Sequence, residues 1–182
     1  MLKTHLQYLK YVLLHKWYVF WECLHVRAGV WRAIRHDWTK FTKTEWSPYV
    51  RWFYARPTEK AALQAHKNAF MEAWRHHVGY NDHHWEFWTK RADGKMYATV
   101  MPESCVREMV ADWRGVCRAK GQHRSAAVIW YLENKKKIAF HPFTRDRVEF
   151  LLEMHNPHAF KETNFLPNTV EVPEPVYRMP GS

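Results

Sequence analysis

The sequence His36-Asp37-Trp38-Thr39-Lys40 closes the second of the predicted helices and places an imidazole beside a carboxylate. Adjacent side chains on a helix point about 100° apart, so such a pair does not pack against a single face. Both side chains can still reach one cation held in a cleft between helices. A neutral imidazole nitrogen and a carboxylate oxygen are typical ligands of Zn, Mn, Fe and Co. The pair therefore predicts a metal site, provided that other helices supply further ligands.

Length and composition set the broad class of the protein. The chain has 182 residues, enough for one domain with a substantial core, or for one domain and a tail. Hydrophobic residues make up 47% and charged residues 25%, which is ordinary for a globular protein. The formal charge of +10 favours anionic partners, such as a nucleotide, nucleic acid or an acidic protein.

Cysteine content and hydropathy indicate the compartment. The three cysteines form no CxxC pair, which argues against a disulfide framework and favours a reduced, cytoplasmic setting. The apolar segment Tyr11–Leu24 is interrupted by His15, Lys16 and Glu22. It is too broken for a spanning helix or a signal peptide, so we expect no membrane partner.

Apolar spacing, capping signals and helix breakers predict a chain of helices. Thr42-Lys43-Thr44-Glu45 has the pattern of a capping box, in which the glutamate side chain bonds back to the first backbone N–H. Pro102 stands in the first turn of another helix, and Gly121 suits its end. The predicted helices cover residues 2–26, 30–37, 42–56, 59–78, 102–120, 126–137 and 142–153, and the segment 126–137 could instead form a strand.

The segments between the predicted helices are short. Asp93-Gly94 is a turn signal, so Lys95–Val100 forms a small hairpin or an extended loop. Five of the 9 prolines follow Asn156, which is typical of an extended tail lying on the body or disordered. We therefore predict an all-α fold: one compact multi-helix domain over residues 1–155 and a Pro-rich tail over residues 156–182.

Several predicted helices carry titratable side chains among apolar ones. His15 interrupts the first helix, and Glu108 and Asp112 lie four residues apart on the helix that starts near Pro102. His77, Asn81 and His84 would share a face if their helix continues past Gly79, with His83 as a neighbouring imidazole. We assign no functional role to His66, His76, His123, His141, His155 and His158.

The chain order of these residues carries a family resemblance. A histidine, a His-Asp pair, a histidine cluster and a final aspartate resemble the HD-domain superfamily of metal-dependent phosphohydrolases, whose His-Asp-x-x-Lys form Lys40 completes. Over residues 5–155 the chain also resembles a family of short phage and bacterial proteins, which implies the host cytoplasm as its compartment if a phage encodes it. The segments that match that family are 36–41 (HDWTKF), 81–85 (NDHHW) and 108–113 (EMVADW).

The HD-domain resemblance implies a set of metal ligands. It assigns His15, His36, Asp37 and Asp112 to a first ion, with His5 and His25 as alternatives to His15. It also implies that a second ion can be held by the intervening histidines, which here are His77, His83 and His84. The cofactor would be one or two ions of Mn, Fe, Co, Ni or Zn.

The predicted chemistry is hydrolysis of a phosphate ester. A divalent ion lowers the pKa of a bound water from 15.7 towards about 7 and offsets charge on a phosphoryl oxygen. Lys40 would hold the phosphate, and Glu108 or Glu45 would orient the water or a ligand histidine. The residues that we expect to contact the substrate are Lys16, Arg75, Asn81 and Trp85.

The sequence leaves several functions open. The first is a metal-dependent phosphohydrolase acting on a nucleotide or another phosphate ester. The second is a di-iron oxygenase on the same scaffold, which the extra imidazoles favour. The third is a basic module that binds nucleic acid or protein without catalysis, for which steep salt dependence is expected. A purely structural zinc ion is a fourth and weaker alternative, because such sites usually include cysteine.

Overall fold

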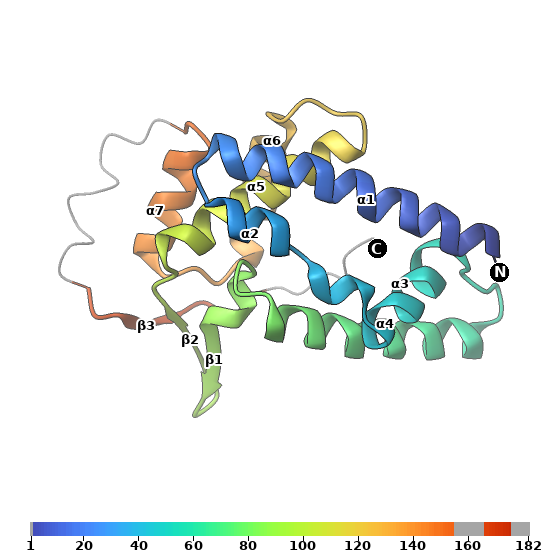
Figure 1. The fold of residues 1–182 in the computed structure, drawn as a ribbon. Coiled ribbons are helices and arrows are strands. Elements are labelled where there is room, and N and C mark those ends of the chain that lie inside the picture. The colour runs from blue at the N-terminus through green and yellow to red at the C-terminus, as the bar shows by residue number, and fades with distance from the viewer. Residues whose placement is uncertain (1, 155–165, 176–182) are drawn as a thin grey trace.

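The computed structural model describes residues 2–154 and 166–175, and helices make up most of them (Figure 1). This confirms the mainly helical prediction. The longer helices are α1 (Leu2–His25), α2 (Val30–Arg35), α3 (Lys43–Tyr54), α4 (Lys60–Tyr80), α5 (Glu103–Ala119), α6 (Ala126–Asn134) and α7 (Pro142–Leu151). Three short 3₁₀ helices are η1 (Trp38–Phe41), η2 (Trp85–Trp88) and η3 (Lys135–Lys137).

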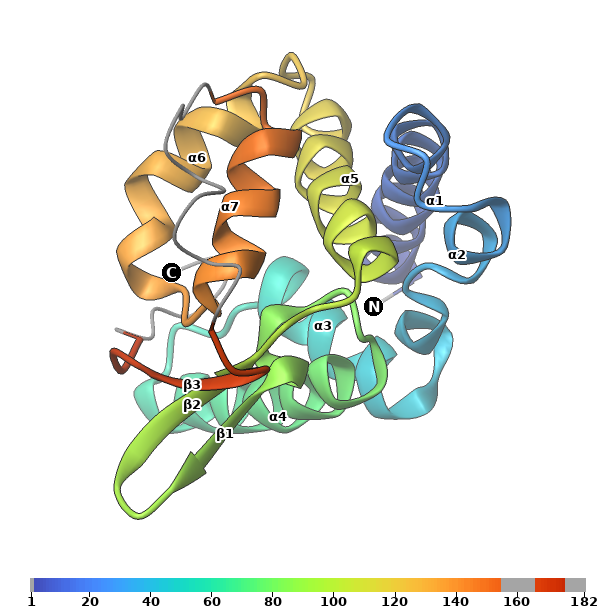
Figure 2. The ribbon, with the colours of Figure 1, turned by 90° about the vertical axis from the view of Figure 1, so that its left-hand side faces the viewer.

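Two helix layers face each other across the molecule (Figures 1 and 2). In one layer α1 packs along α5, which also contacts α6 and α7. A buried cluster that includes Met109, Tyr131 and Val148 fills the α5–α6–α7 contact. In the other layer α3 packs on α4, and Tyr8 of α1 joins Tyr49 and Phe70 in a second cluster that ties the layers together. The short α2–η1 segment connects the layers at one side.

A small antiparallel sheet corrects the all-α prediction. Strands β1 (Thr89–Ala92) and β2 (Lys95–Thr99) form a hairpin, and β3 (Thr169–Val172) adds to β2, giving the order β1-β2-β3. Asp93 and Gly94 both have positive φ, 51° and 72°, as the two central residues of a tight hairpin turn require. Of the two alternatives that the sequence left for this turn, a hairpin or an extended loop, the structure shows the hairpin. The sequence of the third strand carries no periodic signal. This strand has only four residues and lies among prolines, and it is held by its backbone pairing with β2.

The sheet is fixed to the helices by a small apolar contact. Met96 and Ala98 of β2 and Val172 of β3 are buried against Ala139, which follows η3. Of the predicted tail over residues 156–182, the structure describes residues 166–175, which contain β3; His155, His158, Pro157 and Pro180 lie outside the described residues. Within the described chain, no helix combines the length and the hydropathy needed to cross a membrane.

Candidate metal centre

The backbone breaks at the His-Asp pair, where a continuous helix to residue 37 was predicted. Helix α2 ends at Arg35, His36 is extended (φ −44°, ψ 128°), and Asp37 is left-handed (φ 53°, ψ 28°). Aspartate is one of the few residues that tolerate this conformation. Lys16 Nζ supports the break by donating to the carbonyl oxygens of Ile34, at 3.3 Å, and of His36. The break turns two adjacent side chains toward the same buried space.

The first group of possible ligands joins α1, the His-Asp pair and α5. His15 Nε2 lies 3.3 Å from Asp37 Oδ2 and 3.2 Å from Asp112 Oδ1. His36 Nε2 lies 3.2 Å from Asp37 Oδ2, 3.4 Å from Asp112 Oδ1 and 3.3 Å from His15 Nε2. An ion about 2.1 Å from each of four tetrahedral ligands sets those ligands about 3.4 Å apart. The four side chains are therefore spaced as a cation would require.

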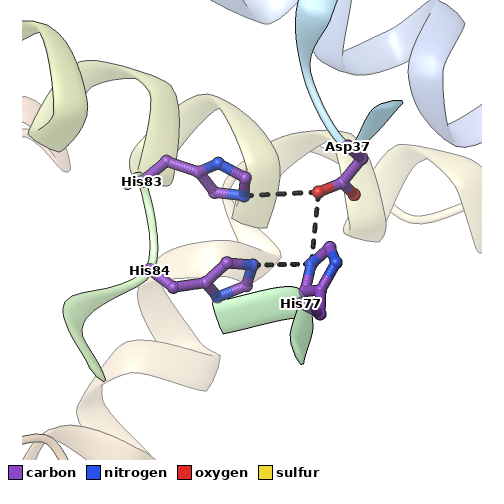
Figure 3. Close-up of side chains that lie close together, drawn as sticks. All are labelled: Asp37, His77, His83 and His84. Atoms are coloured by element: carbon purple, nitrogen blue, oxygen red, sulfur yellow. Dashed lines mark hydrogen bonds and ion pairs between the residues drawn. The ribbon is translucent and has the colours of Figure 1, made fainter. Parts of the chain in front are cut away.

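The second group shares Asp37 through its other oxygen (Figure 3). Asp37 Oδ1 lies 3.2 Å from His77 Nε2 and 3.5 Å from His83 Nε2. His84 Nε2 completes the group, 2.9 Å from His77 Nε2. His77 is on α4, whereas His83 and His84 lie in the turn after it, because α4 ends at Tyr80. The shared face predicted for a longer helix is therefore replaced by a turn that folds back on His77.

Several buried atoms of the two groups have no hydrogen-bond partner within the described chain. They are Asp37 Oδ1, Asp112 Oδ1, His83 Nε2 and His15 Nδ1. An unsatisfied buried polar atom is costly, and a bound ion is one recognised explanation for it. The first three of these atoms lie beside other possible ligands, so the residues present fit a metal.

Glu108 connects the two ligand groups through the imidazole nitrogens that face away from Asp37. Its Oε1 accepts from His36 Nδ1 at 2.9 Å and lies 3.2 Å from His83 Nδ1. A proton held on Nδ1 leaves the electron pair on Nε2, which is the nitrogen that faces Asp37. Burial would raise the pKa of Glu108, but the hydrogen bonds with His36 and His83 lower it to about 2. Glu108 therefore stays ionised and holds one imidazole of each group.

Glu45 has the same relation to the second group alone. Its buried carboxylate accepts from His77 Nδ1 at 2.9 Å and from His76 Nδ1 at 2.7 Å. The capping box predicted at Thr42 is wrong in detail, because Thr42 makes no side-chain cap bond and the Glu45 side chain turns inward instead. His76, to which the sequence assigned no role, is thus a partner of Glu45.

Arg32 binds both Glu108 and Asp82, which directly precedes His83 in the turn after α4. Its Nε lies 2.7 Å from Glu108 Oε2, and its Nη2 donates to Asp82 Oδ1 and, at 3.2 Å, to Cys105 Sγ. One side chain of α2 thereby holds α5 and the turn that carries His83. Sequence patterns gave no signal for Arg32, because its partners are 50 to 76 residues away.

The electrostatics of the centre follow from its burial. Burial would raise the pKa of Asp37, but the charges of His36 and Lys40 help hold it well below its usual range. Burial would lower the pKa of His36, but Asp37 and the hydrogen-bonded carboxylates hold it well above its ordinary value. Burial and the neighbouring imidazoles lower the pKa of His84 well below its usual range, which keeps this side chain neutral and able to act as a ligand.

The other predicted site residues divide into those at the centre and those away from it. Lys40 Nζ donates to Asp37 Oδ2 and is mostly buried. Asn81 Nδ2 donates to Thr39 Oγ1 at 2.8 Å and to the His77 carbonyl at 2.7 Å, which secures the end of α4. Trp85 packs in the hydrophobic core, and Arg75 is exposed on α4 with no contact to the centre among the described residues.

The structure also separates His15 from its two alternatives. His15 is fully buried within the first ligand group. His5 instead accepts from Trp46 Nε1 at 2.8 Å, and His25 is exposed at the end of α1. The three cysteines are free and buried, and none belongs to the ligand groups that share Asp37.

Comparison with known proteins gives one match. No curated protein and no solved structure matches the chain. A family model described as a family of unknown function, DUF5662, matches residues 4–154, the span that contains every possible ligand named above. Because this match covers most of the 182 residues, the chain belongs to the family DUF5662.

Proposed function

We propose that this protein is a metal-dependent phosphohydrolase of the HD type that acts on a nucleotide or another phosphate ester. The observation that supports it best is the meeting of two ligand groups at one carboxylate, with one oxygen of Asp37 on each side. A divalent cation bound there would act as a Lewis acid, lowering the pKa of water and offsetting charge on a phosphoryl oxygen. His15, His36, Asp37 and Asp112 would hold one cation, and Asp37, His77, His83 and His84 the other.

The charge balance of the centre supports a cationic cofactor. Four buried carboxylates, Asp37, Glu45, Glu108 and Asp112, face two permanent cations, Lys40 and Arg32. A buried excess of negative charge is unfavourable unless protons or metal ions offset it. Two divalent cations would reverse the sign and give the centre a net positive charge. A phosphate ester is the kind of substrate that such a centre attracts.

The chain's own residues have separate roles in this proposal. Lys40 lies against Asp37 and is held in place by burial, so its ammonium group would bind a phosphoryl oxygen without further ordering. Glu108 and Glu45 keep the Nδ1 protons of His36 and His77 in place, which orients these rings. Lys16 supports the backbone at His36, so we assign it a positioning role instead of substrate binding.

Oxidation by a pair of iron ions is the second candidate. The five imidazoles His15, His36, His77, His83 and His84 favour it, because nitrogen-rich ligand sets suit iron as well as zinc. Anaerobic loading with Fe²⁺, followed by air and a near-ultraviolet spectrum, separates the two candidates. An iron-dependent band and consumption of oxygen would support oxidation, whereas phosphate release without either supports hydrolysis.

Substitution of the shared carboxylate tests the main proposal. We expect purified wild-type protein to hold up to two equivalents of a transition metal and to release phosphate from an ester panel. Asp37→Asn should lose both ions and this activity, because each group loses an anionic ligand. Asp112→Asn should lose one ion only. Glu72→Gln, exposed on α4, is the matched control and should behave as wild type. Full activity in folded Asp37→Asn would contradict the proposal.

A further inference from the structure

The most exposed tryptophans of the chain lie in one short stretch. Trp17, Trp21, Trp31 and Trp38 have exposed fractions of 58%, 47%, 76% and 67%. Of the other seven tryptophans only Trp130 is exposed, at 42%. Large aromatic side chains are rarely left in water in such numbers unless the surface contacts a partner.

Every exposed Lys, Arg, Asp or Glu side chain in residues 2–43, the stretch that contains these tryptophans, is basic. Residues 2–43 contain two acidic side chains, Glu22 and Asp37, and both are buried. Five basic side chains of this stretch are exposed, and within residues 2–154 and 166–175 none of them forms an ion pair. They are Lys3, Lys10, Arg27, Arg35 and Lys43.

The rings and the cations share one line along α1. Lys3, Lys10 and Trp17 follow at seven-residue intervals, two helical turns apart, and Trp21 lies one turn further. At 1.5 Å per residue this line is about 27 Å long. Helix α2 runs beside α1 in both views (Figures 1 and 2), and its Trp31 and Arg35 are again one turn apart. Both helices therefore place aromatic rings and cations together on one exposed line, with the two lysines of α1 preceding its two tryptophans.

We propose that this surface, the aromatic-basic face formed by Lys3, Lys10, Trp17, Trp21, Trp31 and Arg35, binds single-stranded nucleic acid. Unpaired bases stack on exposed aromatic rings, while lysine and arginine follow the phosphates. A duplex would offer its phosphates but not the faces of its bases, so the exposed rings favour a single strand.

A lipid surface fits this face less well. A helix that lies in a membrane interface separates an apolar side from a charged side. Leu2, Leu6 and Leu13 of α1 are exposed next to this line. Lys3 and Lys10, however, lie on the same line as Trp17, so the exposed side of α1 is mixed in character and not purely apolar. Rings and cations on one line match the bases and phosphates of a single strand instead.

The position of Trp38 connects the aromatic-basic face to the candidate metal centre. Trp38 directly follows Asp37, and its ring is largely exposed. A strand bound along α2 therefore leads toward the ligand groups. This step rests on the proposed function, and it names the substrate class as a phosphate ester of a nucleic acid strand. Binding itself needs neither the metal nor catalysis.

Fluorescence anisotropy of a labelled oligothymidine of about 15 nucleotides, within the site size of single-strand binders, tests the proposal. The pair Trp17→Ala/Trp31→Ala should raise the dissociation constant at least about five-fold, the low end of what stacking of one base contributes. Lys3→Glu/Lys10→Glu should weaken binding and flatten its salt dependence, by about 0.7 in the logarithmic slope for each phosphate that the variant no longer binds. The matched controls Trp130→Ala and Lys136→Glu, exposed on other elements, should bind as wild type.

Three outcomes would overturn the inference: no binding by wild type, equally weakened binding in the controls, or binding to phosphatidylserine vesicles without binding to the oligonucleotide. Circular dichroism of each variant checks that the helices persist. Asp37→Asn separates this inference from the proposed function. A folded Asp37→Asn that loses metal but still binds the oligonucleotide supports the face whatever the activity of the centre, and loss of oligonucleotide binding in that folded variant counts against it.

Discussion

At the scale of single residues, the centre depends on Asp37. Its left-handed backbone ends the run from α2 and lets its two oxygens face different ligand groups. From the sequence, the carboxylate of Asp37 was already a candidate metal ligand, and the adjacent His36 was its expected partner. The division of its carboxylate between two groups depends on His15 and His77, which are 22 and 40 residues away in the chain.

Glu108 offers the sharpest prediction at this scale. It holds His36 of the first group and His83 of the second, whereas Glu45 holds only His77 of the second. Glu108→Gln should therefore weaken binding of both metal equivalents, by about 10- to 100-fold each, as is usual when such a supporting carboxylate is removed. Glu45→Gln should weaken one equivalent and leave the other unchanged. Calorimetric titration with Zn²⁺ distinguishes the two patterns.

The control for this prediction lies on the same helix. Glu103→Gln removes a carboxylate at the start of α5 that pairs with Arg107 and Arg147, away from the ligand groups. Its metal isotherm should match that of wild type. If Glu108→Gln also left both equivalents unchanged, its carboxylate would have no part in orienting the two imidazoles.

At the scale of elements, the close approach of α1 and α5 decides where His15 and Asp112 meet. Gly115 of α5 lies against Val19 of α1, and a Cβ at residue 115 would come 2.4 Å from Val19 Cγ2 and 3.0 Å from the Val19 backbone nitrogen. A glycine is needed here because the opposing backbone leaves no room. The same packing brings α1 and α5 near enough to share a cation.

Gly115→Ala should destabilise the protein by about 1–3 kcal/mol, the usual cost of overpacking a core contact. Gly79→Ala is the matched control, because Gly79 is also helical and its added Cβ meets nothing within 4 Å. Better helix propensity should make Gly79→Ala neutral or more stable by up to about 1 kcal/mol. Urea unfolding of both variants measures the difference, and equal stabilities would show that α1 and α5 can move apart freely.

The elements also show how far local patterns reach. Apolar spacing and breakers predicted α1, α3, α4, α5, α6 and α7 to within a few residues, because those signals act along a single helix. The capping-box interpretation of Glu45 was wrong because the partly exposed His76 and the buried His77 compete for the same carboxylate. The end of α4 at Tyr80 lies two residues past the predicted end at Val78. The bond from Asn81 to Thr39 of a different element, by contrast, had no local signal.

At the scale of the whole molecule, the two helix layers enclose a centre with more carboxylates than permanent cations. A metal bound only by the folded state stabilises that state by mass action. At about 100 times the dissociation constant the gain is about 2.7 kcal/mol, which for a chain of this size raises the melting temperature by about 5–10 °C.

A thermal shift assay with Mn²⁺ and Zn²⁺ measures this gain, starting from protein treated with a chelator. The wild type should show a rise that saturates with metal concentration. Asp37→Asn should show none, while Glu72→Gln should follow the wild type. A similar rise in Asp37→Asn would mean that the stabilising ion binds elsewhere on the surface.

The sequence by itself determined the helical class, most helix boundaries, the hairpin turn at Asp93-Gly94 and the residue types able to bind a metal. These properties follow from side-chain periodicity and backbone preference, which are local. Only the tertiary structure decided which histidines converge on Asp37, that Arg32 and Glu108 join the two ligand groups, and that β3 completes a sheet. Those contacts connect residues tens of positions apart, and their geometry depends on how close the packed helices and strands come.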